Sequence, residues 1–169
     1  MANNHRQILD AGLRKYEDKI VALRALFDAA DHEIGRKEFV AFANELVTDA
    51  GAIEAFSWIP RVGRRDRAAL ELGAIKDGFA GYRITTLNSD GKPVTADERD
   101  EYFPILYSTE VSRAAPIYGL DLGSDSMRRE TLQRARDTDS FSATSIVTLK
   151  TSVAGRYGFF IVLPVFKHG

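Results

Sequence analysis

The side chains that most often perform enzyme chemistry are few in this sequence of 169 residues, and they are widely spaced. The three histidines are His5 and His168 near the termini and His32 near the end of the first predicted helix. Cysteine is absent, so thiol nucleophiles, disulfides and Cys-ligated zinc are excluded. No zinc-protease, phosphate-loop or nucleophile-elbow motif occurs. These observations argue against a catalytic triad, a histidine general acid and a His-rich metal site.

Acidic clusters are the remaining candidates for catalysis or metal binding. Glu98, Asp100 and Glu101 could supply a carboxylate pair, but such runs are usually solvated or paired with a local arginine such as Arg99. Residues 137–139 (Asp-Thr-Asp) could hold a divalent cation, although a helix end passing into a turn explains them better. We therefore predict no metal and no cofactor, and an enzyme with an unrecognised carboxylate site stays as a third hypothesis.

Aromatic side chains give better support for a binding pocket. The predicted strands carry six of them: Tyr102, Phe103, Tyr107, Phe141, Phe159 and Phe160. Ligand sites are concave and mostly apolar, with a few polar groups that orient the ligand. Glu110 and Thr144 are the candidates for those polar groups. Plain core packing explains the aromatic pattern equally well.

Helices are predicted to occupy residues 1–50. Apolar residues recur there at spacings of four and three: Leu9, Leu13, Tyr16, Ile20, Leu23, Phe27, Ala30 and Ile34. This stripe predicts a helix about 40 Å long, broken near Gly35 and followed by a second helix that ends near Gly51. The stripe either packs on the chain's own domain or pairs with the same helix of a second copy, and its length slightly favours the dimer.

The rest of the chain changes period and predicts short helices and strands. One helix is predicted over residues 66–76, capped by Asp66, and another over 123–137, capped by Ser124 or Asp125. A turn is predicted at 88–93. Strands are predicted over residues 82–87, 102–107, 141–149 and 159–166. The order predicts an α+β fold, with a helical stalk over 1–50 and a ligand-binding domain over 51–169.

Composition and charge narrow the class of protein. Apolar residues make up 44% and charged residues 28%, which is typical of a folded domain. The net charge of −1 gives no global attraction to nucleic acid. Two arginine clusters, at 61–67 and 128–136, are predicted to lie on solvated helix faces among acids. No apolar run is long enough to span a bilayer, and the polar start is unlike a signal peptide. Because the chain opens directly into a helical pattern, we expect it to be a segment of a larger protein.

Five short stretches, taken in order, resemble a known family. They are FSWIPRV at 56–62 followed by Asp66-Arg67, RDEYFPILYS at 99–108, GLDL at 119–122, ARDT at 135–138 and LPVF at 163–166. This order and spacing resemble the CHASE domain, the extracytoplasmic sensor of plant cytokinin-receptor histidine kinases and of many bacterial histidine kinases and diguanylate cyclases. The resemblance covers most of residues 35 to 166. Physical reasoning separately predicts that Trp58 is buried where the stalk enters the domain and that Asp121 caps or braces a loop.

The resemblance implies a long N-terminal stalk helix that leads into PAS-like lobes with an antiparallel sheet. It also implies a homodimer, transmembrane helices on either side, and a small ligand in the membrane-distal lobe. By position, Glu110 matches the acidic residue that recognises an adenine-like ring in the plant receptors, and Thr144 matches a pocket threonine. Together with the aromatic set, the predicted ligand residues are Glu110, Thr144, Tyr102, Tyr107, Phe141 and Phe159.

The chain departs from the family pattern at three places. Asp139 stands where the family often has glycine, and Glu110 stands where the plant receptors have aspartate. The family usually continues through another strand beyond the position of Gly169, so an incomplete second lobe is expected. We therefore do not expect plant-hormone specificity to transfer.

Two functions from different classes follow. The first is extracytoplasmic sensing of a small molecule, in the periplasmic part of an inner-membrane histidine kinase or diguanylate cyclase, with no catalysis by this segment itself. The alternative is a dimerisation or protein-interaction module that binds no ligand.

Overall fold

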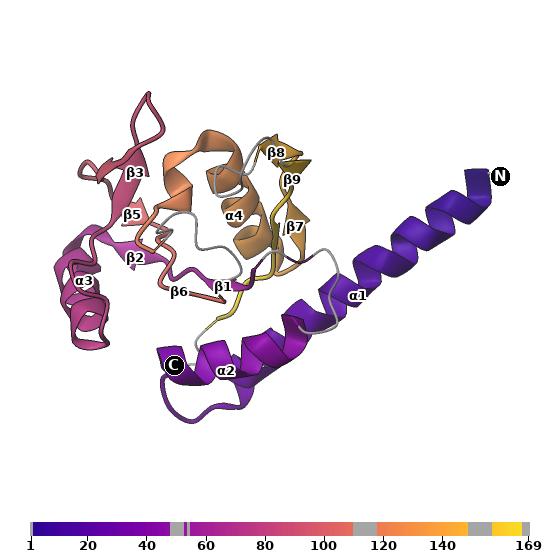
Figure 1. Cartoon of the computed structure of the whole chain (residues 1–169), viewed down its shortest axis with the longest axis horizontal. Helices are drawn as coiled ribbons and strands as arrows, with labels where there is room; N and C mark the ends of the chain where they lie inside the picture. The colour runs from indigo at the N-terminus through magenta and orange to yellow at the C-terminus, as the bar shows by residue number, and fades with distance from the viewer. Residues whose placement is uncertain (1, 48–52, 54, 110–117, 149–156, 167–169) are drawn as a thin grey trace.

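The structure is a computed structural model that describes residues 2–47, 53, 55–109, 118–148 and 157–166. Within those ranges it contains four α-helices and short pairs of antiparallel strands (Figure 1). The predicted α+β class is therefore confirmed.

The first two helices form an antiparallel hairpin. Helix α1 (Ala2–Ala29) is followed by α2 (Arg36–Val47), and Lys19 Nζ on α1 donates to the Leu46 carbonyl at the end of α2 over 2.6 Å. The predicted helix break comes earlier than expected, because α1 ends at Ala29 and Ile34 lies in the connection. Ile34 is only 4% exposed, so its burial belongs to the connection and not to a helical stripe.

The connection between α1 and α2 is braced by a histidine. His32 Nδ1 lies 3.1 Å from Asp31 Oδ1, and His32 Nε2 lies 3.1 Å from Glu38 Oε2 in the first turn of α2. The hydrogen bonds to Asp31 and then to Glu38 raise the pKa of His32, because both carboxylates favour the charged imidazolium.

The strands are short, and in the described ranges each pairs antiparallel with one partner. The pairs are β1 (Ser57–Trp58) with β6 (Tyr107–Ser108), β2 (Val62–Gly63) with β5 (Glu101–Tyr102), β3 (Thr85–Leu87) with β4 (Pro93–Thr95), β7 (Ser142–Ala143) with β10 (Ile161–Val162), and β8 (Val147–Thr148) with β9 (Tyr157–Gly158). The predicted antiparallel finish of the chain is confirmed by the last two pairs.

The single strand predicted over 102–107 is wrong in detail, because β5 and β6 are separated by residues 103–106. In this gap the backbone changes partner: Leu122 N–H donates to the Phe103 carbonyl (3.0 Å) and Ile105 N–H donates to the Leu120 carbonyl (3.1 Å). Pro104 lies in the same gap and has no N–H to continue a ladder. The segment therefore links β2 and β1 on one side to residues 119–122 on the other.

Helix α3 (Arg67–Lys76) and strand β3 lie close to their predicted positions, and β4, which was not predicted, forms a hairpin with β3. Asp66 occupies the N-cap position of α3 without a side-chain capping bond, since it continues a short 3₁₀ turn, η1 (Arg64–Asp66). The predicted turn at 88–93 is confirmed: Asn88 Oδ1 accepts from the N–H groups of Asp90 (3.0 Å) and Lys92 (2.9 Å).

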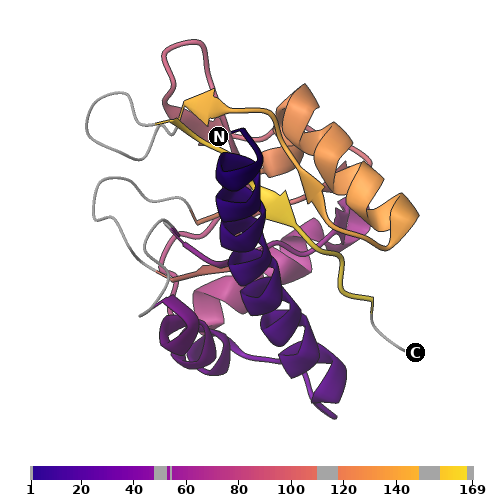
Figure 2. The ribbon, with the colours of Figure 1, turned by 90° about the vertical axis from the view of Figure 1, so that its right-hand side faces the viewer.

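Helix α4 (Ser126–Thr138) follows a second 3₁₀ turn, η2 (Leu122–Ser124). Of the two predicted caps, Asp125 is confirmed, since its side chain accepts from the Arg128 N–H over 3.0 Å. The helix ends on Asp139 in a left-handed conformation (φ 44°, ψ 44°), where glycine is preferred. Asp139 also accepts from Arg24 Nη1 on α1 over 2.9 Å, so α1 contacts the end of α4 (Figure 2).

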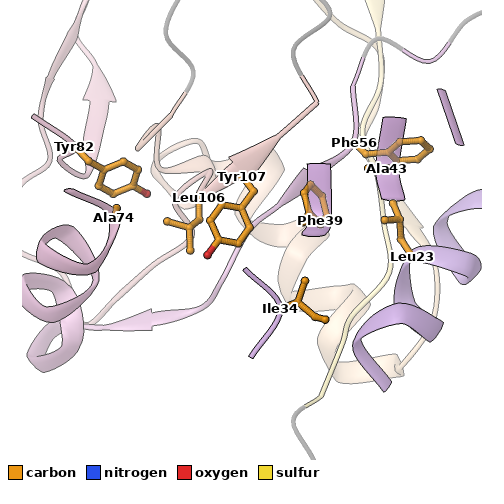
Figure 3. Close-up of a cluster of buried hydrophobic side chains, with 9 residues drawn as sticks. All are labelled: Leu23, Ile34, Phe39, Ala43, Phe56, Ala74, Tyr82, Leu106 and Tyr107. Carbon is orange, nitrogen blue, oxygen red and sulfur yellow. The ribbon is translucent and has the colours of Figure 1, made fainter. Parts of the chain in front are cut away.

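Two clusters of buried apolar side chains form the core. The larger cluster contains Leu23, Ile34, Phe39, Ala43, Phe56, Ala74, Tyr82, Leu106 and Tyr107 (Figure 3). The smaller contains Val62, Ile84, Ala96 and Tyr102. Because the larger cluster draws residues from both sides of residue 50, α1 and α2 share a core with the strands.

Candidate ligand-binding site

Asp121 joins two of the stretches that carry the family resemblance. Its side chain is fully buried, and its Oδ1 accepts from the backbone N–H groups of Phe103 (2.8 Å) and Gly123 (2.9 Å). Its Oδ2 accepts from Arg99 Nη1 over 3.1 Å. One carboxylate thus ties 99–103 to 119–123, which confirms that Asp121 braces a loop.

Gly119 lets the same segment approach β3. Its φ is +83°, and a Cβ built there would lie 2.0 Å from the Arg83 carbonyl oxygen. The Thr85 N–H donates to the Gly119 carbonyl and the Asp121 N–H donates to the Thr85 carbonyl, each over 2.8 Å. The GLDL stretch therefore binds β3 through backbone hydrogen bonds, and its close approach to Arg83 requires glycine as its first residue.

Tyr102 is the largest side chain of the smaller core cluster and is fully buried. Its hydroxyl accepts from the Arg99 N–H (2.8 Å) and donates to the Asp97 carbonyl (3.2 Å). The Arg67 guanidinium lies 5.1 Å from the centre of the Tyr102 ring and donates to Glu71 over 3.0 Å. The ring and the hydroxyl of Tyr102 are both engaged within the fold.

Tyr107 belongs to the larger cluster and packs on α2, with its ring centre 6.0 Å from that of Phe39. Burial raises the pKa of its phenol, so the hydroxyl stays protonated at neutral pH. Beyond it, the buried Thr109 accepts from the Phe56 N–H over 2.9 Å. Strand β6 and the residue that follows it are therefore anchored in the core.

Thr144 lies beyond β7 and is 9% exposed. Its N–H donates to the Phe160 carbonyl, and its Oγ1 accepts from the Phe160 N–H, each over 3.0 Å. Phe141 is partly buried and Phe159 is 46% exposed.

The six predicted ligand residues are thus spread over several parts of the fold. Tyr102 and Tyr107 lie in different core clusters, and Thr144 lies where β10 meets β7. Glu110 lies outside the described residues.

Arginines of the 61–67 cluster pair with acids as predicted, but they do not form one solvated helix face, because Arg61 precedes β2 and the Arg67 side chain is only 18% exposed. Arg61 donates to Glu101 over 2.6 Å and Arg64 donates to Asp100 over 3.2 Å. The carboxylates that were considered for catalysis are therefore engaged in surface ion pairs, with partners other than Arg99. An open hollow beside them is lined by Gly63, Arg64, Arg65, Asp66 and Asp100.

Trp58 was predicted to be buried where the stalk enters the domain; it is only partly buried and stacks on α1. The ring centres of Phe27 and Trp58 are 4.0 Å apart and their planes differ by 20°. Trp58 also pairs with Tyr107 in the β1–β6 register. Helix α1 is therefore in contact with the strand pair that leads to Glu110, which agrees with the prediction that Trp58 lies where the first helix meets the domain.

Two kinds of feature are absent from the residues that the structure describes. No group of three or more His, Asp or Glu side chains in those ranges is placed to hold a metal ion. Among the described helices, none combines the length and the apolar character that a bilayer crossing requires.

Comparison with known proteins identifies the class. CHASE domains are sensor domains of receptors, and the CHASE domain family model matches residues 32–169. The chain therefore belongs to the CHASE domain family, and the resemblance seen in the sequence is confirmed. It is also 32% identical over 123 residues to hybrid signal transduction histidine kinase A of Dictyostelium discoideum. That match covers 71% of this chain and 5% of the length of that protein.

Proposed function

We propose that this chain senses a small molecule as the extracytoplasmic domain of a membrane-bound receptor of the histidine kinase or diguanylate cyclase type. The observation that carries the proposal is the CHASE family match over residues 32–169, supported by the similarity to a hybrid histidine kinase. In this proposal the segment itself is not an enzyme, and catalysis belongs to other parts of the receptor.

The proposed architecture assigns residues 1–50, which contain α1 and α2, as the helical stalk and residues 51–169 as a PAS-like ligand domain. A second copy pairs with the first through α1, and transmembrane helices flank the domain in the receptor. The exposed apolar side chains Leu13 (39%) and Val21 (48%) on α1 support a helix that meets a partner.

The proposed ligand set keeps all six residues with different tasks. Glu110 and Thr144 supply the polar contacts, and the Thr144 hydroxyl, which accepts from Phe160, can still donate its own proton to a ligand. Tyr107, Phe141 and Phe159 supply apolar surface. Tyr102 holds the supporting strand in place, because its side chain is buried and hydrogen-bonded.

Two contacts support a route from this site to α1. The Phe27–Trp58 stack joins α1 to the β1–β6 pair, and the Arg24–Asp139 ion pair joins α1 to the end of α4. A ligand shifts the position of α1 only by the difference between its affinities for the two arrangements.

Thermal-shift screening of the chain against purines, amino acids and organic acids tests the proposal. We expect one class to raise the melting temperature, and Thr144→Val to weaken that ligand about tenfold by removing a buried hydrogen bond. Thr138→Val is the matched control, because Thr138 is exposed at the end of α4. The proposal is refuted if no class stabilises the wild-type chain.

A second candidate is a dimerisation or protein-interaction module that binds no ligand. The exposed apolar side chains of α1 favour it as much as they favour a dimeric sensor. In that case Glu110→Ala and Thr144→Ala leave signalling by the full receptor unchanged.

A further inference from the structure

Arg128 differs from the arginines that follow it on α4. Its Nε is buried and has no hydrogen-bond partner within the described part of the chain. By contrast, Arg129 donates to the Gly123 carbonyl (3.2 Å), Arg134 to the Ser142 hydroxyl (2.8 Å) and Arg136 to Asp137 (2.7 Å). A buried donor without an acceptor destabilises a fold and is rare, so this one requires an explanation.

The guanidinium of Arg128 faces an aromatic ring and not an acid. Its central carbon lies 5.0 Å from the centre of the Phe160 ring. No ion pair involves Arg128 among the described residues, and its side chain is only partly buried. The ring holds the guanidinium in place by a cation–π contact but provides no hydrogen-bond acceptor for its N–H groups.

The strand register places Phe160, whose ring Arg128 contacts, opposite Thr144. In the β7–β10 pair, Ala143 lies opposite Ile161 and Ser142 lies opposite Val162, and the bonds between Thr144 and Phe160 continue this register. Residues directly opposite each other present their side chains on the same face of an antiparallel pair. Thr144 and Phe160 therefore share one face of the strands.

This shared face is the one that α4 covers. Ser142, two residues before Thr144 and on the same face, receives the hydrogen bond from Arg134 of α4. Arg128 reaches Phe160 from the first turn of the same helix. Arg128 thus contacts the ring of Phe160, and the hydroxyl of Thr144 contacts the backbone N–H of the same residue.

We propose that Arg128 binds the carboxylate of a small organic acid, with Thr144 as a second polar contact. This inference rests on the proposed sensing function and names the chemical class of its ligand. A guanidinium presents parallel N–H groups that match the two oxygens of a carboxylate, so the acid supplies the acceptor that the fold lacks. The Arg128 donor, which is unpaired in the chain without ligand, is then the group that determines binding of the acid.

Matched acids and amides test the charge requirement on the 169-residue chain. The probes are benzoate with benzamide, phenylacetate with phenylacetamide, and hexanoate with hexanamide, with inorganic phosphate as a non-planar anion. Melting temperatures and calorimetric affinities are measured for the wild type, Arg128→Met, Arg128→Lys and Arg136→Met. Arg136→Met is the control, because it removes the same charge from an exposed position on the same helix.

We expect at least one acid to stabilise the wild type and Arg136→Met more than its amide does. We expect its dissociation constant to rise about tenfold or more in Arg128→Met and in Arg128→Lys, which keeps the charge but loses the planar fork. If Arg128→Met does not fold, the dissociation constant of the acid for Arg128→Lys alone tests the inference.

Three outcomes overturn the inference: no acid exceeds its amide, phosphate stabilises as well as the acids, or the Arg128 variants bind the acid like the wild type. Neutral ligands that bind in a Thr144-dependent way would then leave the sensing function standing without Arg128 as its determinant.

Discussion

Asp121→Ala is expected to destabilise the domain strongly, because it removes the acceptor of two buried backbone N–H groups, those of Phe103 and Gly123. Each N–H left unsatisfied costs about 1–3 kcal/mol, so the pair accounts for about 2–6 kcal/mol. The lost ion pair with Arg99, whose side chain is 30% exposed, adds at most about 1 kcal/mol. Since a typical domain has a free energy of unfolding of about 5–15 kcal/mol, a large share is lost. Urea unfolding followed by circular dichroism measures it.

Asp121→Asn separates the two contributions, because the amide keeps one oxygen for both N–H groups, whereas its NH2 group replaces the oxygen that accepts from Arg99. We expect this variant and Arg99→Ala each to lower the free energy of unfolding by about 1–3 kcal/mol, because each leaves a buried polar group of residue 121 without its partner. Asp125→Ala, which removes the exposed cap of α4, is the control at about 0.5–2 kcal/mol. The reasoning fails if Asp121→Asn is as damaging as Asp121→Ala, or if Asp121→Ala costs less than the control.

Three further predictions concern α1 and its contacts. Because the carboxylate partners of His32 raise its folded pKa above the unfolded value, its stabilisation is complete below about pH 6.5 and is lost as pH rises through the folded pKa. The melting temperature measured against pH should show this loss, and His32→Gln should abolish it. Phe27→Ala should lower the free energy of unfolding by about 1–3 kcal/mol, less than for a fully buried phenylalanine, and an unchanged emission maximum of the single tryptophan, Trp58, would contradict the stacking. Asp139→Gly should leave the melting temperature unchanged or raise it. The substitution relieves about 1–2 kcal/mol of strain from the left-handed backbone, which outweighs the about 0–1 kcal/mol lost with the Arg24 ion pair. A clear drop in the melting temperature would show that the ion pair dominates.

The helices and turns of this fold could be predicted because their signals are local. Apolar spacing and a capping side chain such as Asp125 act within a few residues, and the turn at 88–93 depends on a single asparagine. The segment 102–107 could not be predicted in the same way. Its composition favours one strand, but its backbone changes partner between β2, residues 119–122 and β1, and this choice depends on segments distant in the sequence.

The candidate site could likewise be predicted only in part. The residue types of Glu110 and Thr144 and the family resemblance were sufficient to nominate them. Arg128 was missed, because in the sequence it is one arginine of a cluster that includes paired neighbours such as Arg136. Only the tertiary position of Phe160 above α4 distinguishes it. An unpaired buried donor is a property of the fold, and no spacing pattern encodes it.

Two contacts lie within one turn of α1: the stack of Phe27 on Trp58 and the ion pair of Arg24 with Asp139. A tilt of α1 would therefore pivot about this turn. Every ten residues of helix add about 15 Å of distance from the pivot, so a tilt of about 5° displaces the backbone by about 1.3 Å per ten residues. At Leu13 the displacement reaches about 1.6 Å, within the range of the helix shifts of about 1–2 Å that switch other proteins. A rearrangement at β1 or at the end of α4 that is too small to open the core can therefore be amplified along α1.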